Sequence, residues 1–214
     1  MIAAYRPVDP AHLSDLLADR LVHAPLPGRA LRVAVDGPGC ASPHSLAESL
    51  LVPLRARGRV AVEIAAETFW RDASLRLEYG REDIESFASW LDAAALRREV
   101  LDPLGPDGSG RYLPSLRDPA TNRATRAPGR RAEPGAIVIV SGELLLGRGL
   151  PFDVTIHLAM SPAGRARRTD ADLQWTLPAF DRYDADVRPA ETADVVIRLD
   201  DPRHPAIRVT SGCR

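Results

Sequence analysis

The chain contains no lysine, so every one of its 28 basic residues is an arginine. A guanidinium keeps its charge at any physiological pH, whereas a lysine amine can lose its proton and attack a substrate. The missing lysine therefore excludes a lysine phosphate ligand, a Schiff-base amine and a lysine general base from any reaction of this chain.

Cysteine and long apolar runs are also scarce. Two cysteines among 214 residues, Cys40 and Cys213, argue against a disulfide framework and against a cysteine zinc site. No apolar run approaches the roughly 18–20 residues that a membrane span needs. Residues 1–9 show no basic patch followed by an apolar stretch, the pattern of a secretory signal. We therefore expect a cytoplasmic protein that does not bind membranes.

Neither sign of charge is in excess, because 28 basic residues face 29 acidic ones and the formal net charge is −1. This balance gives no reason to expect general binding to nucleic acid. A length of 214 residues with 45% hydrophobic residues is enough for one well-packed core. We expect residues 1–214 to form a single domain.

Short apolar runs alternate with segments of helical periodicity along the chain. Buried strands are expected at residues 30–35, 59–64, 136–140, 154–158 and 194–199. Helices are expected at residues 11–22, 45–57, 84–101, 162–175 and 178–192. This alternation predicts an α/β fold of three layers, in which a parallel sheet is flanked by helices on both faces.

Residues 105–134 break the alternation. The stretch is rich in Gly, Pro and Arg, has weak periodicity, and contains six arginines. Long segments of this kind are either functional or irregular. Two interpretations stay open: a solvated insert, or a basic flap over an anionic ligand.

The first predicted strand runs into a glycine-containing loop and then a helix, over residues 33–46. A phosphate-binding loop has a glycine, four residues, then Gly-Lys-Ser/Thr, so that backbone N–H groups and the lysine hold phosphates and the hydroxyl holds Mg²⁺. With Gly37 as the first glycine, the second glycine falls on Ser42, the lysine on Pro43 and the hydroxyl on His44. By the motif alone, the segment is an ordinary glycine-rich turn.

The order of segments along residues 30–200 nevertheless resembles the uridine kinase and phosphoribulokinase group of P-loop kinases, particularly its actinobacterial uridine kinase-like members. The matching segments are residues 33–50 (the phosphate loop), 67–71 (ETFWR), 79–83 (YGRED), 96–106 (LRREVLDPLGP), 111–112, 136–146 (the Walker B strand), 163–170 (AGRARRTD) and 193–197 (ADVVI).

The resemblance implies roles for individual residues. Glu67 falls on the position of the general base. The implied phosphate-binding residues are Gly37, Gly39, Cys40, Ser42, Ser45, Arg165, Arg168 and Arg182. The implied substrate-binding residues are Trp70, Arg71, Tyr79, Phe87 and Arg111.

The departures from the family pattern fall on the groups that neutralise charge. Pro43 replaces the lysine, and His44 replaces the magnesium-binding hydroxyl. The Walker B acid falls on Ser141, which leaves Glu143, two positions later, as a weak candidate metal ligand. Phosphoryl transfer depends on positioning and on neutralising charge, so the Walker A and Walker B motifs are degenerate where the chemistry needs them.

Three functional hypotheses follow. The chain is a pseudokinase, or it is a repurposed enzyme that acts on a nucleoside-like or natural-product molecule with His44 and Glu67 as acid–base residues. The alternative is an active kinase of unusual design, in which lid arginines replace the lysine and Mg-ATP is the cofactor. Those arginines are Arg165, Arg167, Arg168 and Arg182. We expect a small-molecule ligand in each case, and a homodimer is compatible with all three.

Overall fold

The computed structural model describes residues 4–209, so Cys213 lies outside the described residues. Within this part, one sheet has the strand order β1-β9-β8-β7-β2-β6-β3, and the five strands from β8 to the edge strand β3 run parallel. The strands of this sheet are β1 (Arg6–Pro7), β2 (Ala30–Asp36), β3 (Ala61–Ala65), β6 (Ala136–Gly142), β7 (Val154–Ala159), β8 (Val195–Arg198) and β9 (Ala206–Val209).

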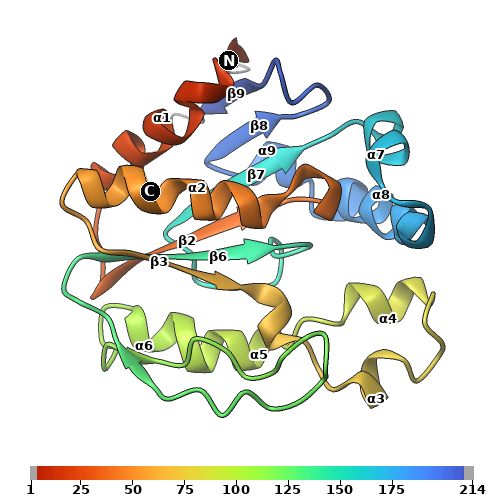
Figure 1. Cartoon of the computed structure of the whole chain (residues 1–214), viewed down its shortest axis with the longest axis horizontal. Helices are drawn as coiled ribbons and strands as arrows, with labels where there is room; N and C mark the ends of the chain where they lie inside the picture. Colours follow the sequence, from red (N-terminus) through yellow and green to blue (C-terminus); the bar gives the residue numbers. More distant parts are fainter. Residues whose placement is uncertain (1–3, 210–214) are drawn as a thin grey trace.

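Helices cover both faces of the sheet (Figure 1), which confirms the predicted three-layer α/β fold. The α-helices are α1 (Pro10–Val22), α2 (Pro43–Ala56), α3 (Ala73–Arg76), α4 (Ile84–Ala88), α5 (Ala93–Leu96), α6 (Asp102–Leu104), α7 (Pro162–Arg168), α8 (Leu177–Asp186) and α9 (Pro189–Thr192). The short 3₁₀ and π-helical segments are η1 (Gly39–Ala41), η2 (Ala66–Phe69), η3 (Arg97–Leu101) and η4 (Ala171–Thr176).

Strand β2 explains why two apolar layers form. Successive side chains of a strand point to opposite faces, and every residue of β2 is buried. Leu31, Val33 and Val35 pack into the core beneath α1 and α2, whereas Ala30 and Ala34 pack into the core beneath α5 and α6. A parallel strand buried on both faces needs such a continuous apolar run, which is why the sequence identified it.

The prediction of a single helix over residues 84–101 is wrong, because the structure has α4, then a break, then α5 and η3. The break lies at residues 89–92. There the N–H of Asp92 donates to the carbonyl of Phe69 (3.0 Å), and the carbonyl of Trp90 accepts from Arg71 (2.8 Å). The carboxylate of Asp92 then caps α5 by accepting from the N–H of Ala95. Backbone bonds to a distant segment thus replace the helical ones.

The two helices expected near the C-terminus are also interrupted. The helix expected at residues 162–175 ends at Arg168 and is followed by the 3₁₀ segment η4. The helix expected at residues 178–192 divides into α8 and α9, because Arg188 adopts a left-handed conformation (φ 51°) immediately before Pro189. The antiparallel strands β1 and β9 were not expected at all.

The insert, residues 105–134, contains one short antiparallel ladder, β4 (Arg111–Tyr112) with β5 (Arg130–Arg131). Elsewhere it is irregular but tied to the body of the protein. The N–H of Leu113 donates to the carbonyl of Glu99, and the N–H groups of Leu116 and Arg117 donate to the carbonyl of Thr68. Its role as a flap stays a prediction.

A buried ion pair holds the amino end of β2 to the segment before β7. The guanidinium of Arg32 binds both carboxylate oxygens of Asp153, at 2.6 and 3.0 Å, and the two side chains are 9% and 8% exposed. Removing one partner of a buried pair leaves the other charge without compensation.

We predict that Asp153→Ala lowers the free energy of unfolding by about 3–5 kcal/mol, because it leaves the Arg32 guanidinium buried and unpaired. Urea denaturation measures this loss. The matched control is Asp201→Ala, which removes the partner of the exposed Arg203 and should change the stability far less, because exposed pairs contribute little. A loss below 1 kcal/mol in both variants would contradict the prediction.

Candidate functional site

The candidate site lies at the carboxyl edge of the sheet, next to the adjacent strands β2 and β7. The chain leaves β2 through α2 toward β3, and it leaves β7 in the opposite direction toward β8. In open α/β sheets, ligands bind in the crevice where neighbouring strands connect in opposite directions. The loop of residues 37–42 lies at this crevice.

The loop lies tightly against the sheet. A Cβ atom at Gly37 would come within 2.7 Å of the Cβ atom of Leu158 in β7, so only glycine fits there. The N–H of Gly37 donates to the carbonyl of Gly142 at the end of β6 (3.2 Å). The predicted loop residue Ser42 is exposed and left-handed (φ 56°), and it directly precedes α2.

The N–H groups of the loop are largely satisfied by the chain itself. Those of Ala41 and Ser42 donate to the carbonyls of Pro38 and Gly39, both at 2.8 Å. The N–H of Gly39 donates to Oε1 of Glu143 at 2.6 Å. A carboxylate of the protein therefore occupies a donor that a phosphate-binding loop offers to its ligand.

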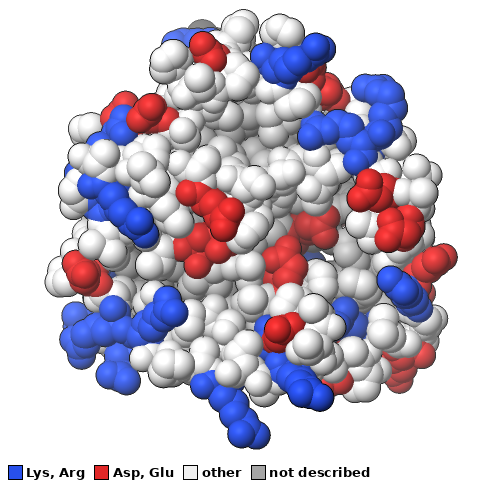
Figure 2. Space-filling view, viewed as in Figure 1, with Lys and Arg blue, Asp and Glu red and all other residues white. Residues whose placement is uncertain are grey.

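Glu143 lies among other acidic groups. Burial raises its pKa, the charges of Glu67 and Asp36 raise it further, and the N–H of Gly39 opposes them; the result is a pKa of about 7. Figure 2 shows acidic side chains near the centre of this face, over the ends of the strands. The loop is thus bordered by negative charge, although phosphate binding needs positive charge.

Glu67, the predicted general base, lies in η2 directly after β3. Burial raises its pKa, with a further contribution from Glu63. A Cβ atom at Gly142 would lie 2.7 Å from the Cβ atom of Ala66 and 3.6 Å from Oε1 of Glu67. Glu67 therefore lies over the end of β6, beside Glu143, as the sequence order predicts.

His44 pairs with an acidic residue that the sequence reasoning missed. Its Nδ1 lies 2.9 Å from Oε1 of Glu63, and its Nε2 lies 3.4 Å from Glu48. The same oxygen of Glu63 accepts a hydrogen bond from Oγ of Ser141 (2.5 Å), the residue at the Walker B position. Partial burial lowers the pKa of His44, but the hydrogen bond and charge of Glu63 outweigh it and raise the pKa. A glutamate within the otherwise apolar strand β3 was the available signal.

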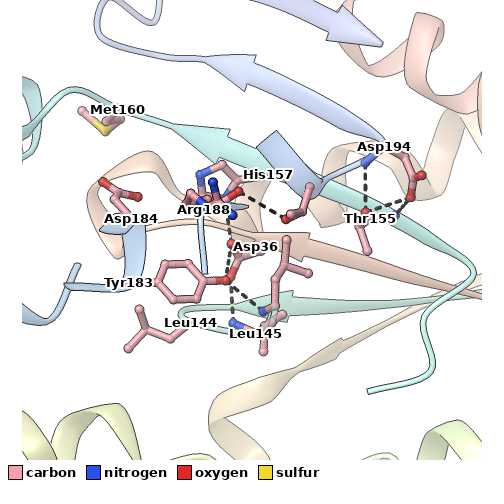
Figure 3. A network of polar contacts seen from close by, with 12 residues as sticks. Asp36, Leu144, Leu145, Thr155, His157, Met160, Tyr183, Asp184, Arg188 and Asp194 are labelled. Atoms are coloured by element: carbon pink, nitrogen blue, oxygen red, sulfur yellow. Dashed lines mark hydrogen bonds and ion pairs between the residues drawn. The ribbon is translucent and has the colours of Figure 1, made fainter. Parts of the chain in front are cut away.

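A second network joins the loop to the rest of the fold (Figure 3). Asp36, at the end of β2, is fully buried, and its Oδ2 lies 2.7 Å from Nδ1 of His157 and accepts from the hydroxyl of Tyr183 at 3.0 Å. Its Oδ1 accepts from the N–H of Leu145 (2.8 Å). Burial, followed by the charge of Asp36, raises the pKa of Tyr183. This network positions the segment that contains Glu143.

Two of the predicted lid arginines, Arg165 and Arg182, pair with acidic side chains outside the loop. Arg165 is buried and binds Asp181 (2.7 Å) and Asp184 (2.5 Å). Arg182 is exposed and pairs with Glu85.

Arg168 donates to the carbonyl of Leu199 (2.8 Å) and lies 3.9 Å from Sδ of Met160. That sulfur is 3.6 Å from Sγ of Cys40, so Arg168 is linked to the loop through Met160. Ser45, in the first turn of α2, is exposed.

The predicted substrate-binding residues do not form one surface. Phe87 is buried in an aromatic cluster whose rings pack edge to face with Trp90, Trp175 and Phe180. Tyr79 is 74% exposed.

Trp70 and Arg71 line a cavity of about 400 Å³ together with Arg117 of the insert. Arg111 lies in β4 of the insert and is exposed. A substrate role for each of these residues stays a prediction.

The residues at the loop do not fit Mg-ATP. Pro43 supplies neither a cation nor an N–H, and the Gly39 N–H is bound to a carboxylate. Among residues 4–209, no group of three or more His, Cys, Asp or Glu side chains is placed to hold a metal ion.

The sequence matches no protein-family model and no curated protein. Solved structures do resemble it. A possible uridine kinase from Bacillus stearothermophilus matches with a TM-score of 0.69 and 18% identity, over 86% of this chain and 96% of that one. A fructose transport system kinase from Silicibacter sp. TM1040 matches with a TM-score of 0.56 and 21% identity, over 84% and 94%.

The YGR205w protein also matches, with a TM-score of 0.56 and 10% identity over 95% of this chain and 100% of that one. The chain therefore has the P-loop kinase fold. No helix in its described part is both long enough and apolar enough to cross a membrane.

We predict that Glu143 makes stability depend on pH. The folded chain holds this proton more tightly than the unfolded chain, whose glutamate has its ordinary pKa of 4.5. Stability due to Glu143 is therefore complete below pH 4.5 and is lost as the pH rises to about 7. The loss corresponds to about 3 kcal/mol.

Urea denaturation at several pH values between 4.5 and 8 measures this effect against Glu143→Gln, which keeps an oxygen for the Gly39 N–H but does not titrate. The difference in stability between the two proteins should change across this range. Glu85→Gln, at an exposed position, is the control. Parallel curves for the native protein and Glu143→Gln would contradict the assignment.

Proposed function

We propose that this chain is a kinase-derived protein that binds a small, nucleoside-like molecule and does not perform ordinary ATP-dependent phosphoryl transfer. The observation that carries the proposal is the 2.6 Å hydrogen bond from the Gly39 N–H to the carboxylate of Glu143. The Glu143 side chain bound inside the loop excludes a phosphate by its volume and, above its pKa of about 7, also repels it by its negative charge.

The size of the repulsion supports this reading. Two unit charges 4 Å apart interact by about 4 kcal/mol at the effective dielectric constant near a protein surface. Glu143 has Glu67 and Asp36 as charged neighbours, whereas the position of the family's lysine is held by Pro43. Even one lost electrostatic donor can reduce a rate by about 10²–10³.

The nucleoside-like ligand rests on the fold. The structural relatives include a protein described as a possible uridine kinase, and the carboxyl edge of the sheet is where such folds bind ligands. Uridine is therefore the first small molecule to test.

We predict that isothermal titration of the native protein with millimolar Mg-ATP, with and without uridine, gives no binding heat from ATP, because the loop has a carboxylate where it needs a cation. Micromolar ATP binding that uridine strengthens would overturn the proposal. It would instead favour the active-kinase alternative, in which Arg167 and Arg168 are the first residues to substitute.

A variant with a more positive loop is the control for a titration in which ATP shows no binding. Pro43→Lys combined with Glu143→Gln supplies a cation and removes the competing negative charge. We expect measurable, weak binding of Mg-ATP to this variant. If it is folded and as inert as the native chain, loop charge is not the reason for the loss.

A second candidate function, a repurposed acid–base enzyme, is favoured by the pair of His44 and Glu63. The Nδ1 contact at 2.9 Å orients the imidazole and leaves Nε2 directed toward Glu48 and solvent. An imidazole oriented by a carboxylate can act as a general base near neutral pH. Glu67 would then supply a second proton-transfer group.

We predict that Glu63→Gln lowers the pKa of His44, because it removes the hydrogen-bonded carboxylate that outweighs desolvation. NMR titration of the imidazole signals measures this pKa. Glu85→Gln is the control: Glu85 pairs with Arg182 and not with His44, so this substitution should leave the pKa of His44 unchanged. An unaltered titration in Glu63→Gln would show that the pair does not set the protonation of His44, and the acid–base candidate would lose its support.

A further inference from the structure

A cavity of about 1080 Å³ lies away from the phosphate-loop position. Its walls come from the C-terminal end of α1, the amino ends of β7 and β8, and the segment of residues 145–152 that joins β6 to β7. Small-molecule sites in proteins commonly have volumes of roughly 300–1,000 Å³. The cavity is therefore large enough for a ligand of metabolite size.

The chain connection explains why the space is open. Parallel strands are usually joined by a helix that covers the sheet. Residues 143–153, which connect β6 to β7, contain no helix, and Gly147 (φ 76°) and Gly149 (φ 66°) turn the chain there instead. The sheet beneath this connection is left without a helix of its own.

Much of the wall is apolar. Leu146, Leu150, Phe152 and Val154 line the cavity, and Leu150 and Phe152 are only partly buried by the protein. When a ligand covers partly exposed leucine and phenylalanine side chains in a concave site, burial of their apolar surface stabilises the complex. The wall therefore favours a ligand with an apolar body.

The carboxylates of the wall are already satisfied within the protein. Each one accepts a hydrogen bond from a guanidinium or from a threonine. These contacts join Asp19 to Arg57 (2.6 Å), Asp153 to Arg32 (2.6 Å), and Asp194 to the hydroxyl and N–H of Thr155 (2.8 and 2.9 Å). Two of these three carboxylates are thus paired with a guanidinium, whereas Asp194 is bound by the neutral groups of Thr155.

The wall of the cavity also contains two basic residues. The guanidinium of Arg20, a half-buried residue, makes no hydrogen bond or ion pair with any other residue of the 4–209 range. His23 lies one helical turn further on, with Nδ1 2.7 Å from the carbonyl of Asp19. A guanidinium presents a planar fork of donors that matches a carboxylate, sulfonate or phosphate group.

We propose that this cavity binds an amphipathic anion, whose apolar body packs on the leucine and phenylalanine wall and whose acidic group binds Arg20. The inference is independent of the proposed function, because none of the phosphate-loop residues lines the cavity.

The test uses two fluorescent probes that differ by one charged group. 8-Anilinonaphthalene-1-sulfonate carries a sulfonate, and N-phenyl-1-naphthylamine is its neutral analogue. The native protein should bind the sulfonate more tightly, and decanoate, an apolar carboxylate, should displace it. Arg20→Ala should weaken the sulfonate by roughly tenfold to a hundredfold, the loss expected for one charge-assisted hydrogen bond, and leave the neutral probe unchanged.

Two further variants test whether the probes bind in this cavity. Ala24→Trp places a large ring in the cavity and should abolish binding of both probes. Arg81→Ala removes an exposed arginine that does not line the cavity, and should change nothing. Circular dichroism and melting temperature establish that each variant is folded.

The proposal is overturned if Arg20→Ala binds the sulfonate as the native protein does, or if folded Ala24→Trp retains both probes. If Ala24→Trp does not fold, the comparison of the two probes in Arg20→Ala still decides the outcome. Equal loss of both probes in Arg20→Ala would also overturn it, because a guanidinium contact acts on the charged probe alone.

Discussion

The buried carboxylate of Asp36 is the interaction on which the arrangement of the site depends. One side chain at the end of β2 binds His157 of β7, Tyr183 of α8 and the N–H of Leu145 after β6. A buried carboxylate that lost these partners would be very costly, so the four elements are held in one geometry. The loop after β2 and the segment that contains Glu143 therefore have fixed positions relative to each other.

This geometry reverses the usual electrostatics of a phosphate loop. Because the segment after β6 is anchored beside the loop, Glu143 reaches the N–H of Gly39, where a phosphate would otherwise be bound. Glu63 lies within β3 and Glu67 directly follows that strand, so both add carboxylates beside the loop, and His44 is hydrogen-bonded to Glu63. The fold is that of a P-loop kinase, and the proposed function holds that the charges at its centre oppose the chemistry of one.

The parallel sheet could be predicted because parallel strands buried on both faces leave continuous apolar runs, as residues 31–35 and 136–140 do, whereas the order of its strands came from the structure. The break in the helix expected over residues 84–101 could not be predicted, because the apolar periodicity is real but the backbone of Asp92 bonds to Phe69 and that of Trp90 to Arg71. Glu67 could be placed from its position after β3. Glu63 could not, since its importance comes from Ser141 and His44, which are distant in sequence.

The sequence alone determined which chemical groups exist: no lysine anywhere, a proline at the lysine position, and glycines where the loop must lie against the sheet. These are covalent facts that folding cannot change. Only the tertiary structure decided which groups meet. It placed Glu143 against Gly39, paired Arg165 with Asp181 and Asp184, and left the guanidinium of Arg20 without a partner among the described residues, because pairing depends on distances across elements far apart in the chain.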